Sequence, residues 1–222
     1  MGTKISFPRV DGKPATGYLA KAGAAHVPGI VVIQEWWGLQ DQIRGICDRL
    51  ALAGYEALAP DLYAGTVVPY HDHDAALREM KSLNFLDATD QVVRGAVQYL
   101  GKTGVKVGLT GFCMGGAVTV LGAVRIPEVA AAVAFYGLPP EGAVKPADVK
   151  IPLQGHYANK DDYSMVQHVK SFEAGLKAAK ANFEFFHYDA DHAFMNEQRD
   201  VHEQVAADLA WKRTLGFWKK YL

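Results

Sequence analysis

The feature of this sequence that most constrains its fold is an alternation of short apolar runs with segments of helical spacing. The runs are rich in β-branched and aromatic residues and read GIVVIQE, YEALAPDLY, VKVGLTG, VAAAVAFYG, IPLQGHYA and NFEFFHYDA. Apolar side chains recur at the α-helical period over residues 41–53, 86–100, 115–124, 164–181 and 201–220. Apolar strands that alternate with helices predict an α/β fold, with a mostly parallel central sheet and helices on both faces.

The N-terminal residues follow a different pattern. The segments KISFP and GYLAKAG flank a turn signal at Asp11-Gly12, which predicts an antiparallel hairpin at one edge of the sheet. No repeat, low-complexity tract or linker interrupts the 222 residues, which suffice for one sizeable core. We therefore expect a single domain over residues 1–222, without a separate cap domain and with an open pocket suited to small substrates.

Composition excludes several classes of partner. The formal net charge is −1 and no basic block is longer than Lys219-Lys220, so neither nucleic acid nor an anionic membrane is an expected partner. The N-terminus lacks the apolar stretch of a signal peptide, and no segment approaches the roughly 18 apolar residues that span a bilayer. Cys47 lies in an amphipathic helical pattern, so we expect no disulfide with Cys113 and a cytoplasmic location. We expect a monomer, and nothing in the sequence demands a metal or an organic cofactor.

Chemically capable residues gather where the predicted strands end. An open α/β sheet binds its ligands beyond the carboxyl ends of its strands, so the candidate site is sought there. The residues at these positions are Glu35, Trp36, Trp37, Asp61, Tyr63, Cys113, Tyr136, His156, Asp161, Asp162, Asp191 and His192. We expect the aromatic side chains of Trp37, Tyr63, Tyr136 and Phe194 to contact the substrate.

Cys113 lies at the centre of the segment Gly111-Phe112-Cys113-Met114-Gly115, with G-x-C-x-G spacing between a strand and a helix. In a nucleophile elbow the central residue occupies a strained strand-to-helix turn, and its neighbours must be small to avoid the adjacent helix and strand. The positive end of the helix dipole favours the thiolate form of a cysteine placed there. A buried structural cysteine between two packing glycines is the alternative, and the aspartates and histidines downstream favour the nucleophile.

A general base and an acid that orients it should follow the later strands. His192 comes directly after the last predicted strand, where a loop imidazole could act as the base, and His156 at another strand end is the rival. The orienting acid should precede the penultimate helix, where Asp161 and Asp162 both qualify. We favour Asp161, because one of the two aspartates could instead cap the helix that starts near Ser164.

Two other kinds of site are less well supported by the sequence. Residues 70–74, Tyr-His-Asp-His-Asp, alternate ligand-type side chains, but no distant ligands accompany them and a solvated loop before a helix is favoured over a metal site. The glycine-rich TGFCMGG lacks the Lys-Ser/Thr pair of a phosphate loop, and G-x-G-x-x-G spacing does not follow the first parallel strand.

Together these residues resemble the dienelactone hydrolase family, a branch of the α/β-hydrolases with a cysteine nucleophile. The resemblance runs along nearly the whole chain, through QEWWGL, APDLY, GFCMGG, AFYG, GHYANKDD and DADHAF. It implies an α/β-hydrolase fold with Cys113 as nucleophile, His192 as base and Asp161 as orienting acid. It also implies that Glu35 interacts with the resting thiol until substrate displaces it, and then helps to draw the proton from sulfur. The resemblance further implies an oxyanion hole made of the backbone N–H groups of Trp36 and Met114.

The sequence departs from the family at the positions that would bind a substrate carboxylate. A basic residue usually follows the catalytic histidine closely, whereas here Asn196 stands in that stretch and Arg199 is the nearest cation. A second family arginine should lie in the helical segment after APDLY, for which Arg78 is the candidate. Trp36 and Trp37 also replace smaller apolar residues, so the pocket is expected to be narrower or flatter.

These observations predict a cysteine-dependent hydrolase of a small activated ester or enol lactone, acting through a thioester as in carboxymethylenebutenolidases of aromatic degradation. A thiolate suits such substrates, because a weakly basic enol leaves before sulfur is expelled. A broad carboxylesterase or thioesterase is the alternative among enzymes. A redox or ligand-binding protein on the same fold is the alternative outside them, and Cys47 is poorly placed as its resolving thiol.

Overall fold

The computed structural model describes residues 1–222 and has one eight-stranded sheet as its centre. The strands lie in the order β1-β2-β4-β3-β5-β6-β7-β8. Their bounds are β1 Thr3–Pro8, β2 Pro14–Ala20, β3 Gly29–Ile33, β4 Glu56–Pro60, β5 Val107–Phe112, β6 Val129–Phe135, β7 Leu153–Ala158 and β8 Phe183–Tyr188. Strand β2 is antiparallel to both neighbours and every other pair is parallel, so the predicted edge hairpin and parallel sheet are both present.

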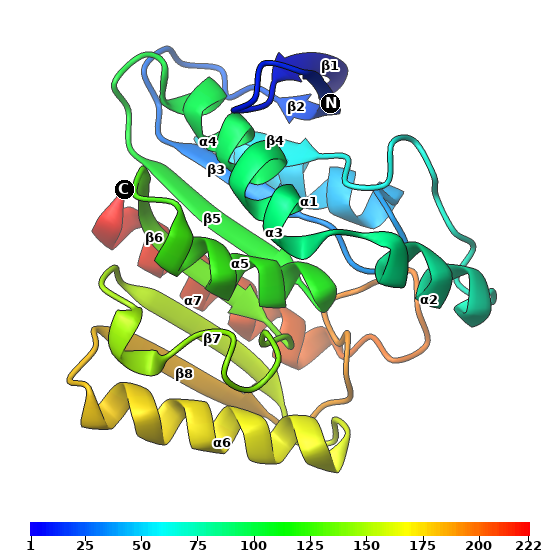
Figure 1. Ribbon diagram of the computed structural model, residues 1–222, viewed down its shortest axis with the longest axis vertical. Helices are drawn as coiled ribbons and strands as arrows, with labels where there is room; N and C mark the ends of the chain where they lie inside the picture. The colour runs from blue at the N-terminus through cyan, green and yellow to red at the C-terminus, as the bar shows by residue number, and fades with distance from the viewer.

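Helices cover both faces of this sheet (Figure 1). They are α1 Asp41–Leu52, α2 His73–Ser82, α3 Phe85–Asp87, the π-helical η1 Ala88–Val93, α4 Arg94–Gly101, α5 Met114–Arg125, the 3₁₀ turn η2 Pro146–Asp148, α6 Tyr163–Ala178 and α7 Gln204–Tyr221. Helices α4, α5 and α6 lie on one face, and α1 and α7 lie on the other. None of the helices combines the length and the apolar character that crossing a bilayer requires.

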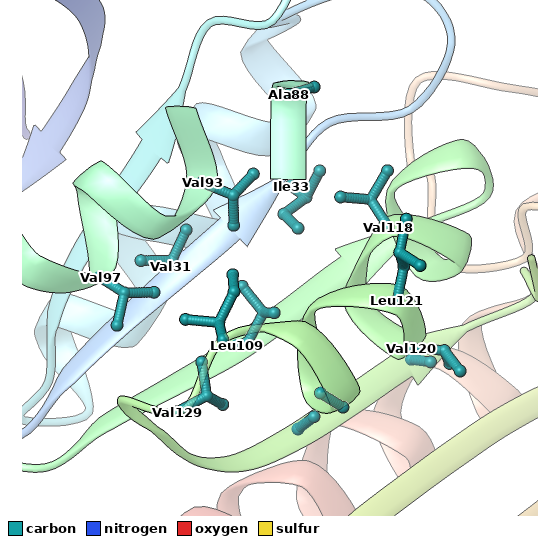
Figure 2. Packing of buried hydrophobic residues seen from close by; sticks show 14 of the residues in the cluster. Val31, Ile33, Ala88, Val93, Val97, Leu109, Val118, Val120, Leu121 and Val129 are labelled. Atoms are coloured by element: carbon teal, nitrogen blue, oxygen red, sulfur yellow. The ribbon is translucent and has the colours of Figure 1, made fainter. Parts of the chain in front are cut away.

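The core is divided by the sheet into two apolar layers, because successive strand residues point to opposite faces. On β3, Val31 and Ile33 pack with η1, α4 and α5, whereas Ile30 and Val32 pack with α1 and α7. Figure 2 shows the first of these layers, in which Val31 and Ile33 project from β3 toward the helices. All four side chains are fully buried, which explains why this strand reads as a continuous apolar run.

Three helices differ from their predicted extents, and one of them is α6, which ends at Ala178 instead of residue 181. The segment expected as one helix over residues 86–100 contains α3, η1 and α4. It is a continuous helix whose middle part, η1, is π-helical. The last helix begins at Gln204 instead of residue 201. The Glu203 side chain accepts hydrogen bonds from the backbone N–H groups of Val205 and Ala206, and this cap fixes the start.

The register of the parallel strands brings their carboxyl ends to one edge of the sheet. Phe112 at the end of β5 pairs with Phe135 at the end of β6, and Ala158 of β7 pairs with Tyr188 of β8. Residues 34–37, 113, 136–140, 159–162 and 189–199 follow these ends and lie at the same edge. This edge therefore carries the candidate site.

Candidate active site

Cys113 forms the sharp turn between β5 and α5. Its backbone angles, φ 54° and ψ −117°, lie in a region that L-residues rarely occupy and that costs on the order of 1–3 kcal/mol. Tyr136 and Ala193, with φ of 36° and 65°, also have positive φ, so three of the six such non-glycine residues lie at this one edge. Backbone strain concentrated in this way is typical of a functional site.

The glycines on either side of Cys113 are required by close backbone contacts. A Cβ atom added to Gly111 would lie 2.2 Å from the carbonyl oxygen of Gly115. A Cβ atom on Gly115 would lie 2.4 Å from the carbonyl oxygen of Ile33 on the neighbouring strand. Only glycine lets helix α5 approach the sheet this closely, so the G-x-C-x-G spacing is a steric requirement of the turn.

Backbone donors are available beside the Cys113 side chain. Met114 is the first residue of α5, so its N–H has no intrahelical acceptor. The N–H of Trp36, in the loop after β3, makes no hydrogen bond within the protein. Both residues line the same cavity as Cys113. Two free donors beside a nucleophile are the elements of an oxyanion hole.

His192 and Asp161 form a hydrogen-bonded pair next to Cys113. The Nδ1 atom of His192 lies 2.7 Å from Oδ2 of Asp161, and the other carboxylate oxygen accepts the backbone N–H of Asp162 at 2.8 Å. Burial opposes protonation of the ring, but the Asp161 hydrogen bond and the adjacent Cys113 sulfur raise the pKa of His192 well above its ordinary value. The Asp162 side chain is exposed at the start of α6, so of the two aspartates Asp161 is the one placed against the imidazole.

His156, the rival base, is a core residue. Its side chain is fully buried, with Nδ1 2.7 Å from the Tyr188 hydroxyl and Nε2 2.9 Å from Oε1 of Gln154. Burial, with a smaller contribution from the charge of Arg213, lowers the pKa of His156 to about 3. Both ring nitrogens are occupied within the protein, and His156 lines neither of the cavities that reach Cys113.

Glu35 is a buried carboxylate at the rear of the site, with an exposed fraction of only 3%. The Tyr136 hydroxyl donates to its Oε1 at 3.0 Å, and the Asn196 side-chain amide donates to its Oε2 at 2.9 Å. Burial raises the pKa of Glu35, although both donors and the nearby charges of His192 and Arg199 oppose the rise. No hydrogen bond joins Glu35 to Cys113, so the contact with the resting thiol that the family resemblance implied is absent from this arrangement.

Two cavities meet at Cys113 and His192, and both are also lined by Met80, Met114 and Met165. The first, here called the charged cleft, has a volume of about 660 Å³. The second, here called the apolar groove, has a volume of about 790 Å³. The remaining residues of the charged cleft are Glu35, Trp36, Trp37, His73, Lys160, Asp161, Asp162, Ser164, Asp191, Ala193, Arg199 and Val201. Those of the apolar groove are Phe85, Leu86, Ala117, Val118, Leu121, Arg125, Tyr136, Gly137, Leu138, Pro139, Pro140 and Ala143.

Of the two candidate arginines, only Arg199 reaches the site. It lines the charged cleft, lies over the Trp37 ring at 5.6 Å from the ring centroid, and has no ion-pair partner. Arg78 is exposed on α2 and lines neither cavity, so the expectation that it contacts substrate is wrong for this arrangement. The register of α2 turns it outward, while Met80 of the same helix faces the site.

The expected aromatic contacts divide in the same way. Trp37 lines the charged cleft and Tyr136 lines the apolar groove. Tyr63 and Phe194 line neither: the Tyr63 hydroxyl hydrogen-bonds the Met114 sulfur at 3.3 Å, and Phe194 is fully buried against Tyr136. Both are packing residues behind the site, contrary to the expectation that they bind substrate.

Residues 70–74 and Cys47 have structural contacts. The Asp72 side chain caps α2 by accepting the N–H of Ala75, and the His73 ring packs edge-on against Trp37 at 5.1 Å between centroids. Cys47 is buried in α1, and burial raises the pKa of its thiol. Both cysteines are free thiols.

Several residues of the site were not predicted. Asn196 was noticed in the sequence only as a departure from the family, yet its side chain is one of the two donors to the buried Glu35. Met80 and Met165 were not singled out, although they line both cavities. The apolar groove was missed entirely, because its walls come from α2, α3, α5, α6 and the loop after β6, which no local pattern connects.

Comparison with known proteins identifies the family. Residues 15–222 match the model of the dienelactone hydrolase family. The chain belongs to the dienelactone hydrolase family. It is accordingly a hydrolase of ester bonds with an α/β-hydrolase fold, as the sequence predicted.

Individual relatives agree with this assignment. The chain is similar to "Protein usf" of Aquifex pyrophilus, with 34% identity over 236 residues and full coverage of both chains. It is 32% identical, again with full coverage of both, to a protein of Aquifex aeolicus named "Putative carboxymethylenebutenolidase". A crystal structure named "Putative Dienelactone Hydrolase" from Klebsiella pneumoniae matches the whole chain with a TM-score of 0.86 and 28% identity. A dienelactone hydrolase-like promiscuous phosphotriesterase from metagenomic libraries, at 21% identity and a TM-score of 0.82 with 99% of this chain and 98% of that one covered, shows likeness of fold alone.

Proposed function

We propose that the protein is a cysteine-dependent hydrolase of small activated esters or enol lactones, of the carboxymethylenebutenolidase type. The observation that carries the proposal is the convergence of Cys113, the hydrogen-bonded His192–Asp161 pair and two unpaired backbone N–H groups on one cavity. These groups supply a nucleophile, an oriented base and electrostatic stabilisation of an oxyanion, which together are sufficient for acyl transfer.

In the first half of the reaction, the Cys113 sulfur attacks the acyl carbonyl carbon and its proton passes to His192. The N–H groups of Met114 and Trp36 stabilise the tetrahedral oxyanion. Its collapse breaks the bond to the alcohol or enol oxygen, which takes the proton from His192, and leaves a thioester on Cys113. The Asp161 carboxylate accepts a hydrogen bond from Nδ1 of His192, so that Nε2 of the same ring is the atom that exchanges this proton.

In the second half, His192 takes a proton from water and the resulting hydroxide attacks the thioester carbon. The new tetrahedral intermediate collapses with cleavage of the carbon–sulfur bond, the Cys113 sulfur takes the proton back from His192, and the acid is released. Because sulfur is a better leaving group than an alkoxide, the first step favours substrates whose own leaving group is weakly basic. An enol lactone or an aryl ester meets this condition, and an ordinary alkyl ester meets it poorly.

Arg199 is the proposed contact for an anionic group on the substrate. It lines the charged cleft beside Cys113 and is stacked on Trp37 without an ion-pair partner. Lys160, the other cation of the cleft, is paired with Asp189 at 3.1 Å and is surrounded by aspartates. A carboxylated lactone would therefore be held through Arg199, in the absence of a cation at Asn196.

The test is steady-state hydrolysis of cis- and trans-dienelactone beside p-nitrophenyl acetate, for the wild type and for Cys113→Ala. Cys47→Ala is the matched control, since it removes the other thiol and none of the cavity lining. We expect turnover of the lactone that is lost in Cys113→Ala and after iodoacetamide, and is retained in Cys47→Ala. Undiminished turnover by Cys113→Ala would contradict the proposal. In Arg199→Gln, KM for the carboxylated lactone should rise while that for the neutral ester stays the same.

A further inference from the structure

The apolar groove is larger than a dienelactone-sized substrate needs. If a substrate carboxylate lies at Arg199, the substrate occupies the charged cleft and leaves the groove of about 790 Å³ unfilled. Ligand cavities of roughly 300–1,000 Å³ hold whole drug-sized molecules, so a groove of this volume can hold an extended group. One end of it contains Cys113 and His192, so whatever fills it is in contact with the reacting atoms.

The groove offers an occupant almost no charge or hydrogen-bonding capacity. Apart from Cys113 and His192 at its catalytic end, the only ionic side chain that lines it is Arg125, whose guanidinium is already paired with the Asp90 carboxylate through two hydrogen bonds. The hydroxyl of Tyr136 is likewise engaged, since it donates to the buried Glu35. The remaining side chains are hydrocarbon or thioether, and an anionic or strongly polar group would lose its hydration there without compensation.

The walls of the groove combine a fixed side with an adaptable one. Ala117, Val118 and Leu121 lie on successive turns of α5, which is packed on the sheet (Figure 2 labels Val118 and Leu121). Met80 and Met165 also line the groove and contribute unbranched thioethers, which adjust to ligands of different shape. Leu86, at an exposed fraction of 52%, marks an open mouth toward solvent.

We propose that the apolar groove binds an extended apolar group of a neutral ester, so that esters with an alkyl or aryl group of several carbons form a second substrate class at this site. The apolar group belongs to the ester that Cys113 attacks, and it extends from the reacting carbonyl into the apolar groove. The charged cleft does not suit it, because that cleft is lined by acidic side chains and Arg199. This inference rests on the proposed function of Cys113 and extends it from small lactones to larger neutral substrates.

The first measurement is kcat/KM along two series of esters. In one, p-nitrophenyl acetate, butyrate, hexanoate and octanoate lengthen the acyl group. In the other, acetate esters of phenol and of 4-butylphenol lengthen the leaving group at similar basicity. Each buried methylene is worth up to about a fourfold gain, so we expect an increase of about tenfold or more across one of the series. Values that stay flat or fall along both series would overturn the proposal.

Filling the groove should remove this preference for longer esters. Ala117→Phe places a ring in the groove from α5, and we expect the ratio of kcat/KM for octanoate to kcat/KM for acetate to fall to about one. Ala174→Phe, the same substitution at an exposed position on α6, is the matched control and should keep the length dependence. If Ala117→Phe does not fold, Leu86→Gln at the exposed mouth should reduce the gain. Undiminished length dependence in a folded Ala117→Phe protein, or in Leu86→Gln where Ala117→Phe does not fold, would contradict the proposal.

The two proposals fail in different ways. If Cys113→Ala is inactive and the wild type shows no dependence on ester length, the assignment of Cys113 as nucleophile stands and the groove is excluded as a substrate site. A Cys113→Ala variant that hydrolyses every ester would remove the nucleophile, and with it the basis for placing a substrate in the groove.

Discussion

Asn196 donates its side-chain amide to Oε2 of Glu35 at 2.9 Å, and so holds a buried carboxylate where the family commonly places a cation. The Tyr136 hydroxyl holds the other oxygen at 3.0 Å. Both donors are neutral, so the charge of an ionised Glu35 is compensated by hydrogen bonds and by the more distant cations alone. We infer that Asn196 is a positioning residue that fixes Glu35 in the wall of the charged cleft.

Removal of the Asn196 amide should lower the free energy of unfolding and change the pH dependence of activity. Asn196→Ala leaves a buried acceptor unpaired, which costs about 1–3 kcal/mol of unfolding free energy. It should also raise the pKa of Glu35 further, so the pH–kcat profile should shift to higher pH relative to the wild type. Gln198→Ala, an exposed neighbour, is the control and should change neither. An unshifted pH profile in a stable Asn196→Ala protein would show that the amide is only structural.

Glu35→Gln should make the protein more stable and less active. Because the pKa of Glu35 is higher in the folded protein than in the unfolded chain, its neutral form favours the folded state. This contribution to the free energy of unfolding is complete below the unfolded-state pKa and is lost as the pH rises through the folded-state pKa. The variant should therefore exceed the wild type in unfolding free energy at pH 7–8, and the difference should shrink toward pH 4. Denaturant titrations at several pH values measure this. Acylation should slow in the same variant, and a normal acylation rate would exclude Glu35 from thiol activation.

Asp161→Asn should lower kcat/KM by about 10³–10⁴-fold, because the imidazole loses the partner that fixes its tautomer. The pKa of His192 is raised in the folded protein, so its contribution to stability is complete below the unfolded-state value and is lost as the pH rises through the folded-state value. NMR titration of the His192 ring should show its pKa falling in the variant. Asp162→Asn, the exposed neighbour, should leave both quantities unchanged. Equal effects of the two substitutions would argue against the pairing seen here.

Gly115→Ala should disrupt the turn that presents Cys113. The added Cβ would lie 2.4 Å from the carbonyl oxygen of Ile33, so the start of α5 must move away from the sheet. We expect a loss of at least about 2 kcal/mol of unfolding free energy and a fall in kcat of at least about tenfold. Gly216→Ala in α7 is the matched control: nothing lies within 4 Å of its Cβ position, and helix propensity predicts a gain of about 0.5–1 kcal/mol. Parallel losses in both variants would contradict the steric account.

Sequence patterns predicted those parts of the site that lie directly at the end of a buried strand. The positions of Cys113 and His192 follow from apolar runs that stop at turn residues. The register of the parallel sheet then brings these strand ends to one edge. The sequence already favoured Asp161 over Asp162, and the structure places the Asp161 carboxylate against the imidazole of His192. His156 shows the reverse case, in which a polar residue of a strand end is directed into the core and paired there.

The remaining parts of the site depend on contacts between distant segments. Arg78 and Met80 are two positions apart on α2, and the rotation of that helix decides which of them faces the cavity. Phe194 and Tyr63 follow strand ends as expected, but packing turns their rings inward. The apolar groove is formed by elements separated by up to about half of the chain, so periodicity within any one of them could not reveal it.

The central claim, that Cys113 is the nucleophile, is tested most directly by mass spectrometry of the intact protein quenched in acid within the first turnover of p-nitrophenyl butyrate. The account predicts a mass increase of one butyryl group, mapped to the peptide that carries Cys113, present in the wild type and in Cys47→Ala and absent from Cys113→Ala. A protein that turns over the ester in a single-turnover burst but carries no acyl group on Cys113, or carries it on another residue, would contradict the account.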